Sequence, residues 1–482
     1  MALLGYLRKK TSSEIEHSPW GIQYLISDYP PRGTLRAPSG SEGHNLLLDL
    51  AGKSGVKWTR LEVPWPSVEV TKGCFKWGLL DEVIDGLVSR GINIFLGTAS
   101  TSHKEYQDFP EGYHFPPTDS PEALEGYCRF ARALAERYKD RVRHYEIWNE
   151  PNIQSFWRPD PDAKAYALLV RRVSEAIRSV DSKVKIMAGA LARLDPPTIQ
   201  YTQDFLSQPD IAEQIDILTY HPYNPAPEAM LENITALREA VRQLKPELPL
   251  WQGECGCPSS GDTIHFRGDA PWGYNVQSKW LLRRLLIDLM AGAEASIYFL
   301  IAEFHGHLYA GHPELRMGYN TKGLVQHTTW QTKPAYYALQ NLTAVIDGSW
   351  KLAADKATIE IVEPGIFYGI GKHEDRFPCV PWQVTLRQEG APMLVYWLPW
   401  RPQEIIKPAR VRVELPDVSW NEPVLVDLLS GEVSEVTNKE GALEVPLADY
   451  PMILTERSVL ELADKAQQPT YEEVVSKLRW TY

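Results

Sequence analysis

Short apolar runs alternate with longer amphipathic stretches from Trp20 to about Gly348. The apolar runs are rich in β-branched residues and start about 30 to 50 residues apart, the length of one strand–helix unit with its loops. They predict eight strands, at Ile22–Ile26, Lys57–Leu61, Ile92–Gly97, Val142–Trp148, Val184–Ala188, Ile215–Tyr220, Leu248–Gly253 and Ser296–Ile301. The stretches between them predict helices such as Leu79–Ser89, Pro121–Tyr138, Ala163–Val180 and Asn233–Leu244. This alternation predicts an α/β fold, a parallel (β/α)8 or TIM barrel. A doubly wound open sheet is the alternative, but no glycine-rich phosphate loop follows the first strand.

The pattern changes after Gly348, where short strands separated by turn signals replace the strand–helix alternation. Strands are predicted at Thr358–Val362, Ile366–Gly371, Trp382–Arg387, Met393–Trp397, Val411–Leu415, Pro423–Leu428 and Ala442–Leu447. Such a series is typical of a β-sandwich. We therefore divide the chain into an N-terminal tail (1–18), a barrel (19–348), a β-sandwich (349–460) and a helical C-terminal tail (461–482). No flexible linker joins barrel and sandwich, so we expect the sandwich to brace the barrel.

Composition narrows the class of ligand. The net charge of −12 is spread along the chain, which argues against nucleic acid or an anionic membrane as a partner. The 16 Trp and 23 Tyr supply many flat faces of the kind that stack on sugar rings. Five cysteines without a disulfide spacing favour a reducing compartment, and no apolar run of signal-peptide length follows the basic residues near the start. These features predict a cytoplasmic protein with a carbohydrate substrate; a homo-oligomer stays open.

Two glutamates fall where a barrel carries its chemistry, at the C-terminal ends of strands. Glu150 closes the fourth predicted strand in Trp148-Asn149-Glu150-Pro151, and Glu254 closes the seventh. These strands lie nearly across the barrel from each other, so both carboxylates are expected to reach one pocket. A carboxylic acid facing a carboxylate about 5 Å away is the pairing that breaks a glycosidic bond with retention of configuration.

The motif at 148–151, with a glutamate ending a seventh strand, resembles glycoside hydrolase clan A, and most of all its family 39 of β-xylosidases and α-L-iduronidases. The likeness extends over roughly residues 20 to 460. It is carried by Lys57–Leu96, by Tyr145–Phe156 (YEIWNEPNIQSF) with Trp157, by residues 219–223 (TYHPY), and by residues 333–339 (KPAYYAL). The resemblance implies Glu150 as acid/base and Glu254 as nucleophile.

The same resemblance implies supporting roles for four more residues. Asn149 matches an amide that binds the sugar 2-hydroxyl, and Arg60 matches a cation beside the nucleophile that keeps it ionised. His221 and Tyr223 match a sixth-strand pair near the two carboxylates. A structural ion pair for Arg60 and a plain core position for His221 are the alternatives.

Aromatic and histidine residues complete the candidate site. Trp148 is expected either to pack or to form a wall of the pocket. The eighth strand lacks the Trp that clan members place under the bound sugar; Tyr298, Phe299 or Phe304 is expected to substitute. His305, His307 and His312 are interpreted as loop residues near the sugar, and neither a metal nor an organic cofactor is expected.

The expected activity is hydrolysis of a β-linked glycoside by double displacement, with a β-xyloside as the first substrate. Retaining enzymes of other specificity (β-glucosidase, β-galactosidase, uronidase or an endo-acting glycanase) remain alternatives within the class. Transglycosylation by the same two carboxylates and a barrel that binds carbohydrate without cleaving it are the others.

Overall fold

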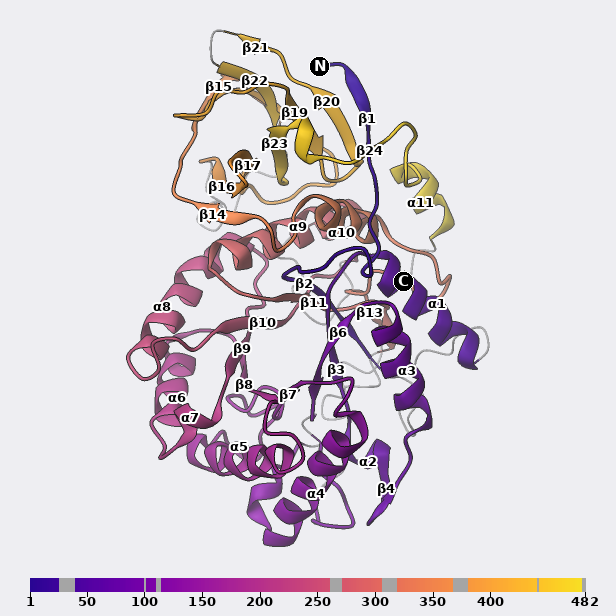
Figure 1. Ribbon diagram of the computed structural model, residues 1–482, viewed down its shortest axis with the longest axis vertical. Helices are drawn as coiled ribbons and strands as arrows, with labels where there is room; N and C mark the ends of the chain where they lie inside the picture. The colour runs from indigo at the N-terminus through magenta and orange to yellow at the C-terminus, as the bar shows by residue number, and fades with distance from the viewer. Residues whose placement is uncertain are drawn as a thin grey trace.

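The computed structural model describes residues 1–25, 40–98, 101–109, 114–260, 271–305, 319–366, 380–439 and 442–478. Eight parallel strands close into a barrel in chain order, as predicted. They are β2 (Trp20–Tyr24), β3 (Trp58–Glu62), β6 (Asn93–Gly97), β7 (His144–Glu146), β8 (Lys185–Ala192), β9 (Ile217–His221), β10 (Leu250–Cys255) and β11 (Ser296–Tyr298). Figure 1 shows the barrel in the lower part of the molecule.

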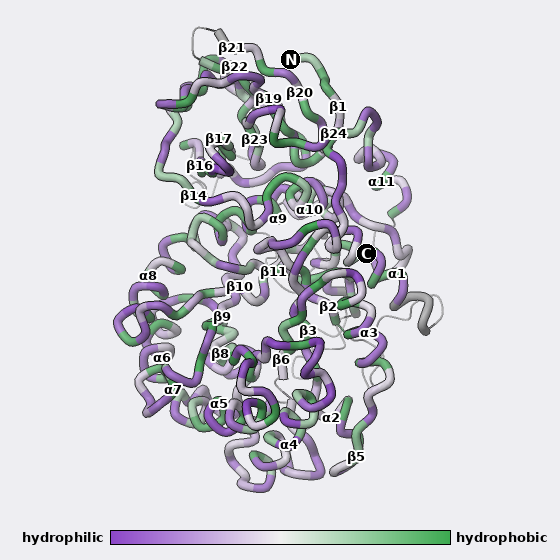
Figure 2. Tube along the Cα trace, in the orientation of Figure 1, coloured by the Kyte–Doolittle hydropathy of each residue, from purple (hydrophilic) through white to green (hydrophobic). Residues whose placement is uncertain are grey.

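Helices surround this barrel. The long ones are α1 (Gly40–Lys53), α3 (Gly78–Ser89), α4 (Pro121–Tyr138), α5 (Ala163–Arg178), α6 (Pro196–Leu206), α8 (Met230–Arg242), α9 (Tyr274–Met290) and α10 (Pro334–Val345). Shorter elements are α2 (Trp65–Val68), α7 (Ile211–Gln214), η1 (Pro117–Asp119), η2 (Pro227–Ala229) and the small hairpins β4 (Glu69–Thr71) with β5 (Cys74–Phe75) and β12 (Phe304–His305) with β13 (Tyr319–Asn320). Hydrophobic and hydrophilic positions recur along helices such as α5 and α8 (Figure 2), because each buries one face on the barrel.

Helix α4 shows how local sequence sets an element's start. Ser120 is its N-cap, and the side chain accepts a hydrogen bond from the backbone N–H of Ala123. Pro121 follows at the first helical position, where its missing N–H removes no helical hydrogen bond. The predicted start and end of this helix are both confirmed.

The C-terminal region forms an antiparallel β-sandwich. One sheet runs in the order β14 (Lys351–Ala353), β16 (Trp382–Gln388), β17 (Ala391–Trp397), β23 (Met452–Glu456), β19 (Pro423–Asp427), β20 (Glu432–Glu435), β1 (Leu3–Leu7) and β24 (Leu462–Ala463). The second runs β15 (Thr358–Glu363), β18 (Ala409–Glu414), β22 (Ala442–Leu447) and β21 (Asn438–Lys439). Apolar side chains from both sheets, including Tyr396, Val411 and Val445, form a core between them. The predicted strand Ile366–Gly371 lies almost wholly outside the described residues.

The two chain termini depart from what the pattern predicts. Residues of the expected N-terminal tail form β1, which pairs with β20 on one side and β24 on the other. In the C-terminal tail only α11 (Tyr471–Lys477) is α-helical among the described residues, and Leu462–Ala463 is a strand. Charged residues at helix-compatible spacing favoured a longer helix, but pairing with β1 holds this segment extended.

Helices α9 and α10 lie between the barrel and the sandwich (Figure 1). Helix α9 is buried nearly all round, including its charged residues. Lys279 Nζ lies 2.8 Å from Asp449 of the sandwich, and Arg283 donates to the backbone carbonyl of Trp400 at 2.7 Å. These contacts fix the sandwich against the barrel. Within the described part of the chain, no helix has both the length and the apolar character of a membrane span.

Candidate active site

The turn after β7 brings Glu150 into the barrel mouth. Trp148 and Glu150 both adopt positive φ, 68° and 46°, a region that costs a residue with a side chain about 1 kcal/mol. Trp148 is fully buried, and its indole N–H donates to the carbonyl of Phe156 at 2.8 Å. It therefore anchors the turn rather than forming a wall of the pocket. Backbone strain of this kind persists where the surroundings over-determine it.

Glu254 enters the same pocket from β10, three places along the barrel from β7. Its two oxygens have different partners. Tyr223 Oη donates to Oε1 at 2.8 Å, and Arg60 Nη1 donates to Oε2 at 2.7 Å. The carboxylate is therefore fixed in rotation by a neutral donor on one side and a cation on the other.

Arg60, from β3, is the centre of the charged cluster. It has no exposed surface and donates through Nε to Glu146 at 2.6 Å, and through Nη2 to the side-chain carbonyl of Asn149 at 2.8 Å. Glu146 is also bonded by the hydroxyl of Thr219, at 2.6 Å. The guanidinium thus orients the amide of Asn149 as well as Glu254, and its charge is balanced by buried Glu146.

Sequence reasoning missed Glu146. Its position offered one signal: it lies two residues after His144 in β7, and strand alternation makes both face the barrel interior. A carboxylate buried inside a barrel needs a positively charged partner, and Arg60 is a buried cation that contacts it.

His221, at the end of β9, contacts the other glutamate. Its Nδ1 lies 2.9 Å from Glu150 Oε1. Burial, and then the charge of Arg60, hold the pKa of His221 well below its usual range, so the ring is neutral. A neutral imidazole accepts a hydrogen bond from a protonated Glu150, or donates one to its carboxylate after the proton has left.

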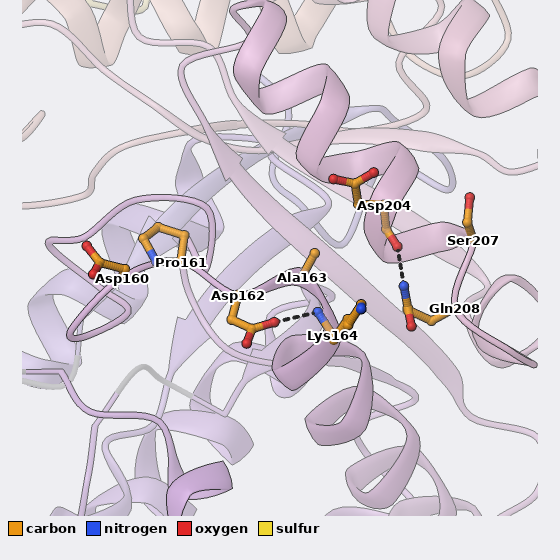
Figure 3. Close-up of a pocket in the computed structure, with 8 residues that line it drawn as sticks. All are labelled: Asp160, Pro161, Asp162, Ala163, Lys164, Asp204, Ser207 and Gln208. Atoms are coloured by element: carbon orange, nitrogen blue, oxygen red, sulfur yellow. Dashed lines mark hydrogen bonds between the residues drawn. The ribbon is translucent and has the colours of Figure 1, made fainter.

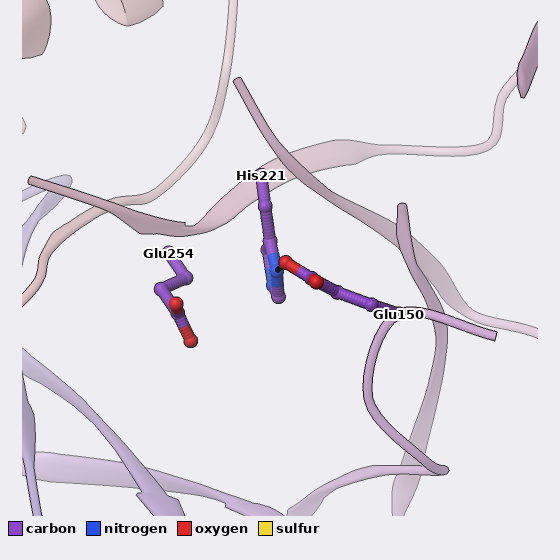
Figure 4. Close-up of side chains that lie close together, drawn as sticks. All are labelled: Glu150, His221 and Glu254. Carbon is purple, nitrogen blue, oxygen red and sulfur yellow. Dashed lines mark hydrogen bonds and ion pairs between the residues drawn. The ribbon is translucent and has the colours of Figure 1, made fainter. Parts of the chain in front are cut away.

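Glu150, His221 and Glu254 lie close together, with the carboxyl group of Glu150 against the ring of His221 and Glu254 to one side (Figure 4). One oxygen from each carboxyl group and one ring nitrogen lie within 4.8 Å of one another. Two oxygens and a nitrogen are also a donor set that a divalent cation accepts. A cation there would have to compete with Arg60 for Glu254 and displace protons held at raised pKa values.

The surroundings give the two carboxyl groups different proton affinities. Burial, followed by the charge of Glu254, raises the pKa of Glu150 well above its ordinary value. Burial also raises the pKa of Glu254, to about 7, although Arg60 and the Tyr223 hydroxyl act in the opposite direction. The expectation that Arg60 keeps Glu254 ionised thus describes only one of the opposing effects. Glu254 ionises first, and Glu150 keeps its proton to higher pH.

Strand β11 does not supply the expected sugar platform. Tyr298 has no exposed surface, and its hydroxyl lies 3.0 Å from the carbonyl of Lys322 and 3.2 Å from that of Cys257. We therefore correct its assignment: it is a buried packing residue. Phe299 and Phe304 are also buried and contact each other. His307 and His312 lie outside the described residues, as does the side chain of His305.

A separate hollow of about 600 Å³ lies at the surface, between the start of α5 and the end of α6. Figure 3 shows that its polar groups are used locally: Asp162 bonds the backbone N–H of Lys164, and Gln208 bonds the carbonyl of Asp204. Asp162 is the N-cap of α5. None of the buried carboxylates described above lines this hollow.

Comparisons with known proteins agree with this geometry. Residues 47–279 match the model of the family described as Cellulase (glycosyl hydrolase family 5). A β-xylosidase of Geobacillus stearothermophilus is 23% identical over 235 residues, which cover 43% of this chain and 44% of that protein. A β-galactosidase, BgaB, of Geobacillus sp. (strain Y412MC61) is 33% identical over 121 residues, 21% of this chain and 18% of the relative. The chain thus spans less than half the length of either relative.

A solved structure extends the likeness to both domains. A family 39 glycoside hydrolase from the gut symbiont Bacteroides cellulosilyticus WH2 superposes with a TM-score of 0.63 at 16% identity, covering 91% of this chain and 81% of that one. At this identity the likeness concerns the fold. The fold and the family match define a clan A barrel. In the sequence of its barrel and in its fold, the chain is similar to the glycoside hydrolases of clan A, as the sequence indicated.

Proposed function

We propose that this protein hydrolyses β-linked glycosides with retention of anomeric configuration, with Glu254 as nucleophile and Glu150 as acid/base. The supporting observation is the pair itself: their oxygens lie within 4.8 Å, in surroundings that make Glu150 the stronger proton holder. Retaining enzymes place the two carboxyl groups about 5 Å apart, whereas inverting enzymes leave about 6.5 to 9.5 Å for a water molecule.

In the first step, a carboxylate oxygen of Glu254 attacks the anomeric carbon. The bond to the leaving oxygen breaks, and that oxygen keeps the electron pair and takes the proton of Glu150. The result is a glycosyl ester on Glu254. The neutral ring of His221 contacts Glu150 and adds no proton of its own.

In the second step, a water molecule attacks the same carbon as Glu150, now a carboxylate, removes its proton. The ester bond breaks, and its electron pair returns to Glu254. Two inversions give net retention. Arg60 and Tyr223 receive the returning charge, because each already donates to one oxygen of Glu254.

Asn149 is the residue we assign to the sugar 2-hydroxyl. Its side-chain carbonyl accepts from Arg60, which leaves the amide N–H groups to face the pocket. A hydrogen bond to the 2-hydroxyl is a contact that strengthens in the transition state of such enzymes.

A β-xyloside is the first substrate to test, since the relatives include a protein named β-xylosidase. β-Galactosides, β-glucosides and uronides follow, together with a polymer digest for endo action. Transglycosylation would appear as new glycosides when acceptor alcohols are added.

The decisive experiment is azide rescue of two alanine variants on aryl glycosides, followed by NMR. Glu254→Ala should lose turnover, and azide should restore it with an α-glycosyl azide as product. Glu150→Ala should give the β-azide instead. Glu294→Ala is the matched control, because Glu294 is exposed and contacts Trp251 at the opposite end of the barrel. Wild-type product with inverted configuration would reject the mechanism, and binding without any turnover would indicate a non-catalytic barrel.

A further inference from the structure

A buried lysine lies beside the nucleophile without a full set of partners. Lys322 follows β13 and is 1% exposed. Within the described part of the chain, its ammonium group makes one hydrogen bond, to the side-chain oxygen of Asn320 at 3.5 Å, beyond the usual 2.7 to 3.2 Å range. An ammonium group has three donors, so this one retains unused capacity.

This ammonium group lies near Tyr223. Lys322 Nζ lies 5.9 Å from the centre of the Tyr223 ring. Tyr223 is the residue whose hydroxyl donates to Glu254 Oε1. Glu254 is also the carboxylate that attracts Lys322 most strongly. Burial lowers the pKa of Lys322 to about 8, which leaves the group charged at neutral pH. The lysine therefore brings a second cation to the pocket, in addition to Arg60.

The two sides of Glu254 correspond to the two sides of a sugar ring. Asn149 and Arg60 lie on the Oε2 side, whereas Tyr223 lies on the Oε1 side. In a pyranose, C2 and the ring oxygen are the two neighbours of C1. If Asn149 takes the 2-hydroxyl, the ring oxygen faces Tyr223. The C5 substituent, attached next to the ring oxygen, then lies on the side of Tyr223, the residue that Lys322 Nζ approaches.

We propose that Lys322 recognises a carboxylate at C5 of the sugar, so that the preferred substrate is a β-linked uronide. This inference rests on the proposed function, and on the placement of Asn149 in particular. It departs from the β-xyloside that the relatives suggest, because xylose has no C5 substituent and would leave the ammonium group unpaired. A neutral hydroxymethyl group compensates a buried charge less well than a carboxylate does.

The chemistry of the intermediate adds a second reason. When Glu254 becomes an ester, it loses the negative charge that attracts Lys322. A carboxylate carried by the sugar replaces that charge for as long as the intermediate lasts. The carboxylate of a uronide therefore pairs with Lys322 in both steps of the reaction.

The test compares 4-nitrophenyl β-D-glucuronide and β-D-galacturonide with the glucoside, galactoside and xyloside. We expect the wild type to favour a uronide in kcat/KM. Lys322→Met should lower kcat/KM for uronides by about 100-fold, as loss of a hydrogen bond to a charged group implies, and should change the neutral substrates by less than about fivefold. Lys322→Arg should retain part of the preference. Lys183→Met, at an exposed turn, controls for the loss of one positive charge.

The outcomes separate this inference from the mechanism. Neutral glycosides hydrolysed with retention, and faster than uronides, would overturn the role of Lys322 alone. An equal loss on all five substrates, with a shifted pH profile, would make Lys322 a group that tunes Glu254 and would also overturn it. No hydrolysis of any substrate would reject the proposed function itself. If Lys322→Met fails to fold, inhibition of the wild type settles the question: D-glucuronate should inhibit at lower concentration than D-glucose or D-xylose, and the reverse order would reject the inference.

Discussion

The two ends of the barrel interior are built from opposite kinds of residue. Near the start of the strands the interior is apolar, with Trp58 and Trp251 in edge-to-face contact at 4.7 Å, packed with Phe95, Met187 and Ile297. Near the strand ends it holds Arg60, Glu146 and the two candidate catalytic glutamates. One end closes the barrel, and the other keeps charges buried in fixed positions.

This difference separates stability from chemistry. Burial of large aromatic side chains stabilises the fold by 1.5 to 3 kcal/mol or more for each, in order-of-magnitude terms (about 25 cal/mol per Å²). A buried carboxyl group with a raised pKa lowers the stability of the fold once it loses its proton. Changes at the two ends should therefore affect different measured quantities.

The largest expected effect is on catalysis. Glu254→Gln preserves shape but removes the attacking oxygen anion, so kcat should fall by roughly 10⁵-fold or more, the scale seen when a nucleophile is removed. Stopped and continuous assays measure kcat on the aryl glycoside that the wild type hydrolyses fastest. The free energy of unfolding should change little at neutral pH. A residual rate above about 1% of wild type would contradict the role of Glu254.

Removal of an aromatic side chain from the opposite end should destabilise the fold instead. Trp251→Ala leaves a cavity beside Trp58 and should lower the free energy of unfolding by about 3–5 kcal/mol, measured by urea denaturation. Turnover per folded molecule should stay within a few-fold of wild type, because the side chain lies away from the candidate site. Full stability with lost activity would show that the two ends are coupled.

A substitution among the charged residues should raise the free energy of unfolding instead of lowering it, by an amount that depends on pH. The pKa of Glu150 is higher in the folded protein than the ordinary value near 4.5. Its stabilising contribution is thus present below pH 4.5 and is lost as the pH rises through the folded-state pKa. Glu150→Gln should therefore raise the free energy of unfolding by about 1–3 kcal/mol at alkaline pH, relative to its effect at pH 4. An equal difference between the urea midpoints of wild type and Glu150→Gln at both pH values would contradict the assigned pKa shift.

The smallest expected effect lies outside both ends. Ser120→Ala removes the N-cap of α4 and should cost about 1 kcal/mol of stability at any pH. Thermal unfolding measures it, and activity per folded molecule should not change. A pH-dependent loss would indicate that α4 is linked to the charged cluster.

The sequence predicts the fold well because local patterns determine its elements. Eight apolar runs correspond to the eight barrel strands, and Ser120-Pro121 marks the start of α4 within one residue. The two glutamates could be placed because they end strands in a barrel of known geometry. These signals need no knowledge of distant contacts.

The parts that sequence did not predict depend on contacts between distant segments. Glu146 appears as one more strand residue until Arg60 is brought beside it from another strand. Tyr298 looked available for stacking, because nothing local indicates that its hydroxyl is buried against carbonyls of two loops. Lys322 carried no motif at all; only its burial next to Tyr223 distinguishes it from other lysines.

Strand β1 gives the molecule an unusual connectivity. It lies inside the larger sheet of the sandwich, between β20 and β24, although these strands come from the opposite end of the sequence. The whole barrel is therefore an insertion within the sandwich domain, not a module that precedes it. During synthesis, Leu3–Leu7 has neither of these partner strands until residues 432–463 have been made, so completion of this sheet is a late event in folding that depends on very long-range contacts.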